Sequence, residues 1–436
     1  MTKILRGMNY SPTWIGWSPG QPGQFSDSDF FNDAFEAMWN KGETSGSQVH
    51  QYRDDLGVIS NAGLNLIRLF NWGPTRGWNG TKGNGHISAL NRASTLGMKV
   101  IVPVSNYFLS DDKYAWDNTD PDDSFSFSSA PTGIQSDLTN FISSVTVNGS
   151  IHSAVHSFSV GNEIDLNNMV GQGTSGPVSP TSRLKRVIWW LINLQAKCAD
   201  SGLLFTSPIS DGDQGGTEAA TPSYWFQAIV NGVTNSTSLP NGTVSGGETT
   251  FKSTVSGLST AASSYASWYY NSVNIYTTGS KLSSTIGQYD SWTANSKNSL
   301  NWPGQQFTVP LMLTEVGSNR GGGIVSASAQ ETQYTTIVTD IVTEIETYIT
   351  GHTDSLLIGY CVYEFSDETT LNANWGTNMV ESPTESGGNI LFSPMTGATI
   401  VSFGTFPSVS YPVQELFPVT SSGGTTLLAG IKAAIS

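Results

Sequence analysis

Short apolar runs recur along the chain, and most of them are unbroken rather than alternating with polar residues. Unbroken apolar runs are typical of parallel strands that are buried on both faces of a sheet. Eight runs are strand candidates: Leu5–Tyr10, Asn65–Phe70, Lys99–Val104, Ser157–Glu163, Leu204–Ile209, Ser272–Tyr276, Pro310–Val316 and Leu356–Phe365.

Helical patterns separate these runs. The clearest is Arg183–Ala199, which carries apolar residues at helical spacing, and Ala329–Ile349 carries a second stripe that includes Ile341 and Ile345. The other candidate helices are Tyr52–Asn61, Gly85–Leu96, Gln135–Val145, Ala261–Tyr270 and Thr285–Leu300.

Eight strands alternating with helices predict an α/β fold, a (β/α)8 TIM barrel, in preference to a doubly wound sheet. Long polar loops follow several strands, and in a barrel they would gather at the C-terminal face, where active sites lie. Without a convincing linker, we predict a single catalytic domain over residues 1–436, with residues 400–436 packing on the barrel as a C-terminal extension.

Two of the strands end in a carboxylate. The fourth runs into Gly161-Asn162-Glu163, and the seventh contains Thr314-Glu315-Val316-Gly317. A barrel brings the ends of strands four and seven to opposite sides of one cleft. Two facing carboxylates there are suited to act as general acid/base and nucleophile.

The two carboxylates would need different environments. The nucleophile must be ionised, whereas the acid must hold a proton near neutral pH. Arg68 is a charge inside an apolar strand, and buried arginines are rare unless paired, so we expect it to hold Glu315 ionised, with Tyr276 donating a second hydrogen bond. The alternatives are a purely structural ion pair for Arg68 and a rim aromatic for Tyr276.

These motifs resemble those of the clan-A retaining glycoside hydrolases, (β/α)8 enzymes with Asn-Glu ending strand four and Glu ending strand seven. The segments Gly7–Pro12, Asn65–Phe70 and Tyr363–Glu368 are similar to the β-1,3-glucanase and β-1,3-glucanosyltransferase branches. The resemblance implies that Glu163 is the acid/base, that Glu315 is the nucleophile, and that Asn162 binds the sugar 2-hydroxyl.

Further residues are assigned to substrate binding. Glu364, at the end of the eighth strand, is a rival carboxylate that we place in the binding set, and Tyr10 belongs to the first-strand motif. Several of the 13 Trp fall in loops, where aromatic faces can stack on pyranose rings. Trp72, after strand two, and Trp375, after strand eight, are the preferred platforms.

Composition narrows the class of ligand. Charged residues make up 12% of the chain, about half the usual quarter. The net charge of -15 argues against a nucleic-acid partner, and no apolar run is long enough for a membrane span. Cys198 and Cys361 are interpreted as buried free thiols, although a disulfide stays open.

The histidines have no metal-site spacing, and the acidic run from Asp111 to Asp123 lacks the ordered spacing of a calcium loop, so we predict no metal and no cofactor, with calcium binding by that run as the alternative. Neutral polar loops favour an extracellular or cell-surface protein, although the N-terminus has no signal-peptide pattern.

The sequence therefore predicts a monomeric retaining glycosidase that cleaves β-linked polysaccharide, β-glucan by resemblance. The alternatives are a transglycosylase with the same residues and a non-catalytic glycan-binding or structural barrel.

Overall fold

The structure is a computed structural model. It describes residues 4–11, 54–72, 87–110, 113–116, 131–166, 180–198, 201–211, 268–294, 309–318, 327–365 and 417–436, together with short helix or strand segments between them. Within these parts of the chain, no helix is both long enough and apolar enough to cross a bilayer.

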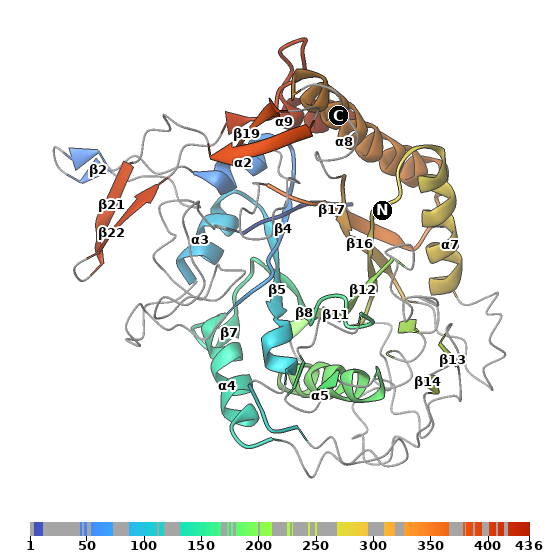
Figure 1. Ribbon diagram of the computed structural model, residues 1–436. Helices are drawn as coiled ribbons and strands as arrows, with labels where there is room; N and C mark the ends of the chain where they lie inside the picture. The colour runs from blue at the N-terminus through green and yellow to red at the C-terminus, as the bar shows by residue number, and fades with distance from the viewer. Residues whose placement is uncertain are drawn as a thin grey trace.

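A parallel β-barrel forms the centre of the molecule (Figure 1). Its strands in spatial order are β11 (Leu204–Thr206), β8 (Val155–Val160), β5 (Lys99–Val104), β4 (Leu66–Arg68), β1 (Leu5–Asn9), β17 (Leu357–Val362), β16 (Leu311–Val316), β15 (Asn271–Ile275) and β12 (Pro208–Ser210). All neighbouring pairs are parallel.

The nine strand segments make eight barrel strands, because β11 and β12 are halves of one strand interrupted at Ser207. The first half pairs with β8 and the second half pairs with β15, so this strand closes the barrel. The sequence predicted it as one uninterrupted strand. The interruption arises where the Ser207 hydroxyl donates to the carbonyl of Val160 on β8 at 2.7 Å.

Helices form an outer ring around the strands (Figure 1). They are α2 (Asp55–Asn61), α3 (Ile87–Thr95), α4 (Ile134–Ser144), α5 (Pro180–Cys198), α7 (Leu282–Ala294) and α8 (Ala327–Gly351). The apolar stripe of α5, which includes Leu184 and Leu191, is buried against the barrel, as is the stripe of α8 that includes Ile341 and Ile345. The (β/α)8 prediction is confirmed.

Two other predictions have clear outcomes in the described residues. Cys198 and Cys361 are both buried and free, as expected. The helix predicted over Ala261–Tyr270 is wrong for its last three residues, because Trp268–Tyr270 form a turn and a bridge to Phe205 on β11 that lead into β15. Its earlier residues lie outside the described part.

The barrel interior holds apolar side chains together with hydrogen-bonded hydroxyls, and charged groups lie beyond them toward the C-terminal end of the strands. At its N-terminal end a cluster of Leu66, Ile101, Tyr270, Met312 and Cys361 fills the interior. Because side chains alternate between the two faces of a strand, the residue two positions beyond Leu66 returns to the same face. That residue is Arg68, so the C-terminal end of the same interior surface carries a charge.

The last helix, α9 (Leu427–Ala434), packs on α8. Thr426 caps it by accepting a hydrogen bond from the backbone N–H of Ala429 at 3.2 Å. Leu427 and Ile431 are fully buried in the main hydrophobic core. The helices approach closely at Gly430, where a Cβ would lie 2.6 Å from Thr339 Oγ1.

Short elements outside the barrel complete the described structure. The 3-10 helices are η3 (Asn106–Leu109) and η8 (Gly279–Lys281). The antiparallel pairs are β2 (Thr44–Ser45) with β3 (Gln48–Val49), β6 (Thr146–Val147) with β7 (Ser150–Ile151), β9 (Gln172–Gly173) with β10 (Gly176–Pro177), β13 (Thr243–Val244) with β14 (Thr249–Thr250), β18 (Asn378–Met379) with β23 (Phe417–Pro418), β19 (Glu381–Ser386) with β20 (Asn389–Pro394), and β21 (Val401–Phe406) with β22 (Val409–Val413).

The packing of α9 leads to a stability prediction. Ile431→Ala removes a fully buried side chain from the core and should lower the free energy of unfolding by about 2–5 kcal/mol. Chemical denaturation measures it. Lys432→Ala, on the exposed side of the same turn, is the matched control and should change stability by less than about 0.5 kcal/mol. Equal stability of the two variants would mean that α9 is not part of the barrel's cooperative unit.

Candidate active site

A buried ion pair joins Arg68 and Glu315 at the C-terminal end of the barrel. Nη1 of Arg68 lies 2.6 Å from Oε1 of Glu315, and the two side chains are 1% and 4% exposed. The same nitrogen donates to Asn9 Oδ1 at 3.0 Å, while Nη2 donates to Asn162 Oδ1 at 2.6 Å. The Arg68 guanidinium therefore connects β16, which carries Glu315, with the turn after β8, which carries Asn162.

Tyr276, just past β15, supplies the second contact to this carboxylate. Its hydroxyl donates to Oε2 of Glu315, as the sequence predicted. Burial, followed by the negative charge of Glu315, raises the pKa of Tyr276 well above its ordinary value, so the phenol keeps its proton and stays a donor. Both oxygens of Glu315 thus accept hydrogen bonds, one from Arg68 and one from Tyr276.

An aromatic wall lies beside the ion pair. The Arg68 guanidinium lies 4.8 Å from the ring centre of Phe70, and Tyr363 makes edge contacts with both Phe70 and Tyr276. Sequence reasoning did not identify Phe70 or Tyr363 as part of the site. Aromatic rings around a charge pair limit its contact with water and so strengthen the interaction.

Glu315 faces the interior because β16 is irregular. Its pairing with β15 shifts by one residue between Val273 and Asn274, so that Asn274 pairs with Glu315 rather than with Thr314. A bulge re-aims side chains and allows neighbouring residues to turn toward one side. Here Thr314 bonds to Asn274 while Glu315 reaches Arg68.

The second carboxylate lies in a tight turn rather than on a strand. The sequence predicted a strand through Glu163, but β8 ends at Val160. Gly161 (φ 68°) and Glu163 (φ 49°) are both in the left-handed region, which Glu rarely adopts. A Cβ at Gly161 would also lie 2.6 Å from Ile164 and 2.8 Å from Leu109, so this position requires glycine.

Asn106, which follows β5, holds this turn in place. Its Oδ1 accepts from the backbone N–H of Asn162 at 2.8 Å, and its Nδ2 donates to the carbonyl of the same residue at 2.9 Å. The Asn106 side chain thereby bonds both backbone groups of Asn162, as a neighbouring strand would, and it holds the turn that carries Glu163.

The surroundings of Glu163 favour its neutral, protonated form. Its pKa is raised from 4.5 to about 8, first because burial disfavours the charged form and then because Glu315 is negative. Donation from Asn274 Nδ2 to Glu163 Oε1, at 2.9 Å, opposes this rise without cancelling it. Near neutral pH Glu163 therefore carries a proton that it can donate.

Two predicted binding residues lie elsewhere. Tyr10 is 1% exposed, and its hydroxyl donates at 2.9 Å to Asp55 at the start of α2. Alternation along the chain explains this, because Asn9 occupies the inward position and Tyr10 points toward the helices. Trp72 is fully buried, and its Nε1 donates to Ser144 at the end of α4 at 2.8 Å. The predictions that they bind substrate are therefore wrong.

The remaining predicted residues are only partly placed. Glu364 follows β17 and is 1% exposed, so it lies at the predicted end of the barrel. Trp375 and the acidic run from Asp111 to Asp123 lie outside the described residues, apart from 113–116. Trp116 packs against Arg186, whose guanidinium carbon lies 5.1 Å from the centre of the Trp116 ring.

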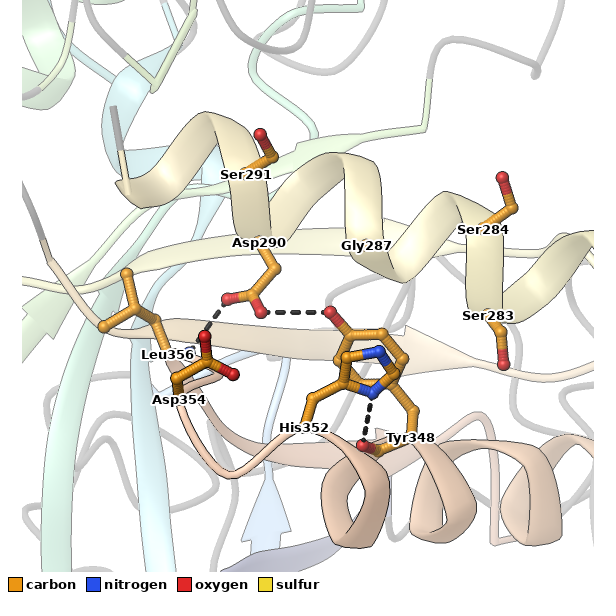
Figure 2. Close-up of a pocket in the computed structure, with 9 residues that line it drawn as sticks. All are labelled: Ser283, Ser284, Gly287, Asp290, Ser291, Tyr348, His352, Asp354 and Leu356. Atoms are coloured by element: carbon orange, nitrogen blue, oxygen red, sulfur yellow. Dashed lines mark hydrogen bonds between the residues drawn. The ribbon is translucent and has the colours of Figure 1, made fainter. Parts of the chain in front are cut away.

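A separate pocket of about 610 Å³ lies between α7 and α8 and includes neither Glu163 nor Glu315 in its lining (Figure 2). The rings of His352 and Tyr348 are stacked, with their centres 4.1 Å apart, and the Tyr348 hydroxyl donates to Asp290 Oδ2 at 3.0 Å. Asp290 also accepts from the backbone N–H of Leu356 at 2.9 Å. These contacts hold the end of α8 against α7, and we assign the pocket no chemistry.

Within the described residues, no group of three or more His, Cys, Asp or Glu side chains is arranged to hold a metal ion.

Comparisons with known proteins give structural neighbours only. No protein-family model matches the chain, and no curated protein sequence does either. The chain is similar to a β-glucosidase from Exiguobacterium marinum (TM-score 0.46, 11% identity, covering 90% of this chain and 96% of that one). It is also similar to a β-glucosidase from Thermotoga maritima (TM-score 0.49, 10% identity, covering 86% of this chain and 92% of that one).

A third similar structure is the Bacteroides uniformis β-glucuronidase (TM-score 0.38, 14% identity, covering 75% of this chain and 30% of that one). Identities this low do not transfer an activity, so an activity has to come from the chain's own side chains.

The raised pKa of Glu163 predicts a pH-dependent stability. Between pH 4.5 and about 8 the unfolded chain ionises Glu163 while the folded chain keeps its proton, so the wild type loses stability as pH rises through this window. Glu163→Gln removes the effect. The melting temperature of this variant should therefore rise relative to the wild type from pH 5 to pH 8, as measured by thermal denaturation across that range. A difference that does not change with pH would contradict the assignment.

Proposed function

We propose that the protein is a retaining glycoside hydrolase that cleaves β-linked polysaccharide, with Glu315 as nucleophile and Glu163 as general acid/base. The observation that carries the proposal is the opposite environment of the two carboxyl groups. Glu315 is paired with Arg68 and accepts from Tyr276, whereas Glu163 is buried beside that negative charge and has a raised pKa. Such a pair divides the roles of nucleophile and general acid/base between two residues of the same type.

In the first step, an oxygen of Glu315 bonds to the anomeric carbon as the bond from that carbon to the leaving oxygen breaks. The electron pair of the broken bond goes to the leaving oxygen, which takes the proton of Glu163. The product is a glycosyl ester on Glu315, and Glu163 is left as a carboxylate.

In the second step, Glu163 takes a proton from water, and the water oxygen attacks the anomeric carbon and releases Glu315. The pKa of Glu163 should fall after the first step, because esterification removes the negative charge of Glu315 that helped to raise it. A lower pKa suits Glu163 to its second role as a base. An acceptor sugar in place of water would make the same site a transglycosylase.

Asn162 is supported as a sugar-binding residue by the orientation of its amide. Its Oδ1 accepts from Arg68 Nη2 at 2.6 Å and from Asn274 Nδ2 at 3.2 Å. With the oxygen so occupied, the Nδ2 hydrogens are directed away from these partners as donors for a substrate hydroxyl.

The substrate class is supported by composition and by the resemblance of the motifs. A sparsely charged chain rich in Ser, Thr, Asn, Gly and Trp offers hydroxyls, amides and aromatic faces to an uncharged polymer. The β-1,3-glucanase-like motifs make β-glucan the first substrate to test, and an extracellular or cell-surface location would suit such a polymer.

The proposal predicts that Glu315→Ala and Glu163→Ala each lower turnover of β-glucan by at least about 100-fold while the protein stays folded. Product chromatography over β-1,3-, β-1,4- and β-1,6-glucans, mannan and xylan measures turnover, and circular dichroism checks folding. Glu344→Gln, on α8, is the control and should keep full activity.

The stereochemistry is a further readout of the same assay. NMR of the first-formed product should show the β-anomer, because two displacements at the anomeric carbon restore its configuration. Full activity in either Ala variant, or an α-anomer as the first product, would contradict the proposal.

A further inference from the structure

The amide of Asn274, on β15, connects the two carboxyl-bearing segments. It is fully buried, and its Nδ2 donates to Glu163 Oε1 at 2.9 Å and to Asn162 Oδ1 at 3.2 Å. Its Oδ1 accepts from the hydroxyl of Thr314 on β16 at 2.8 Å. The donors and acceptor of this side chain are therefore all directed at the site.

Thr314 fixes which way round the amide lies. If the amide were reversed, its oxygen would face Asn162 Oδ1, an oxygen that already accepts from Arg68 and has no proton to donate. The Thr314 hydroxyl would then face the amide nitrogen instead of the oxygen to which it donates. Buried polar groups that lack a matching partner are costly, so the observed orientation is the stable one.

This orientation distinguishes the two oxygens of Glu163. In a protonated carboxyl group one oxygen is the acceptor and the other carries the proton. Since Asn274 donates to Oε1, Oε1 is the acceptor and the proton belongs on Oε2.

We propose that Asn274, held by Thr314, is a positioning residue for the acid/base of the proposed glycosidase, and that Oε2 of Glu163 is the oxygen that gives its proton to the leaving group. This inference rests on the proposed function. The proton leaves Oε2 for the glycosidic oxygen as the anomeric C–O bond breaks, and the amide hydrogen bond to Oε1 strengthens as Glu163 becomes a carboxylate. The amide itself exchanges no proton.

The first test is a titration that needs no substrate. Asn274→Ala removes a donor that favours the ionised form, so the pKa of Glu163 should rise by a measurable fraction of a unit or more. Carboxyl 13C NMR of the full chain labelled at Glu follows this group, and the signal missing in Glu163→Gln identifies it. Asn271→Ala is the matched control, because Asn271 is a buried asparagine at the other end of β15.

The second test uses leaving groups. Asn274→Ala should lower kcat/KM roughly 10- to 100-fold on a β-glucan oligosaccharide, whose leaving oxygen needs the proton. On a dinitrophenyl β-glucoside, whose leaving group departs without a proton, the first step should change less than threefold. A merely structural loss would lower both rates together.

Thr314→Val provides an independent variant if Asn274→Ala does not fold. It should reproduce both effects in weaker form, and Thr314→Ser, which keeps the hydroxyl, should restore wild-type values. An unchanged Glu163 titration in folded Asn274→Ala and Thr314→Val would overturn the inference, as would equal loss on both substrates. If Glu163→Gln itself keeps full activity on the oligosaccharide, it is the proposed function that fails, whereas the titration still decides whether Asn274 acts on Glu163.

Discussion

The site depends on one buried guanidinium. Arg68 ends β4, pairs with Glu315 on β16, and reaches the turn after β8 through Asn162. A charge in this position is stable only while its hydrogen bonds are made, because removing one partner leaves the other buried and uncompensated, at a cost of about 3–5 kcal/mol. The interaction therefore fixes the positions of Glu315 and Asn162 relative to each other.

The difference between the two glutamates follows from that interaction. Glu315 has a cation and a phenol on its oxygens, while Glu163 has an amide on Oε1 and a negative neighbour. The barrel supports this contrast because fully buried side chains, among them Leu66, Ile101 and Met312, close its interior below the site, so little water reaches the two carboxyl groups from that side. Asp165, also buried and negative, adds to the raised pKa of Glu163.

Much of this arrangement could be predicted from the sequence. Unbroken apolar runs predicted the barrel strands, and a charge inside one of them identified Arg68 as a paired residue. Glu163 and Glu315 were found because each follows or ends such a run. These features are local, so spacing along the chain is enough to predict them.

What the sequence did not predict depends on contacts between distant segments. The irregularity of β16 is visible only in its pairing with the neighbouring strands β15 and β17, and it allows both Thr314 and Glu315 to reach the interior. The role of Asn274 could not be predicted either, because it depends on hydrogen bonds to Glu163, Asn162 and Thr314, which are distant in the sequence. Tyr10 and Trp72 were assigned to the wrong side because the exact end of a strand decides which neighbour faces inward, as it does for Asn9 and Tyr10.

The most direct test of the central claim is to trap the covalent intermediate. A β-glucoside with a 2-fluoro substituent and a dinitrophenyl leaving group forms a glycosyl-enzyme that hydrolyses slowly, and peptide mass spectrometry locates the added sugar. The account predicts one sugar per chain, attached to Glu315, with no label in Glu315→Ala. Label on Glu364, or turnover of the unsubstituted glucoside with inversion and no trapped ester, would contradict it.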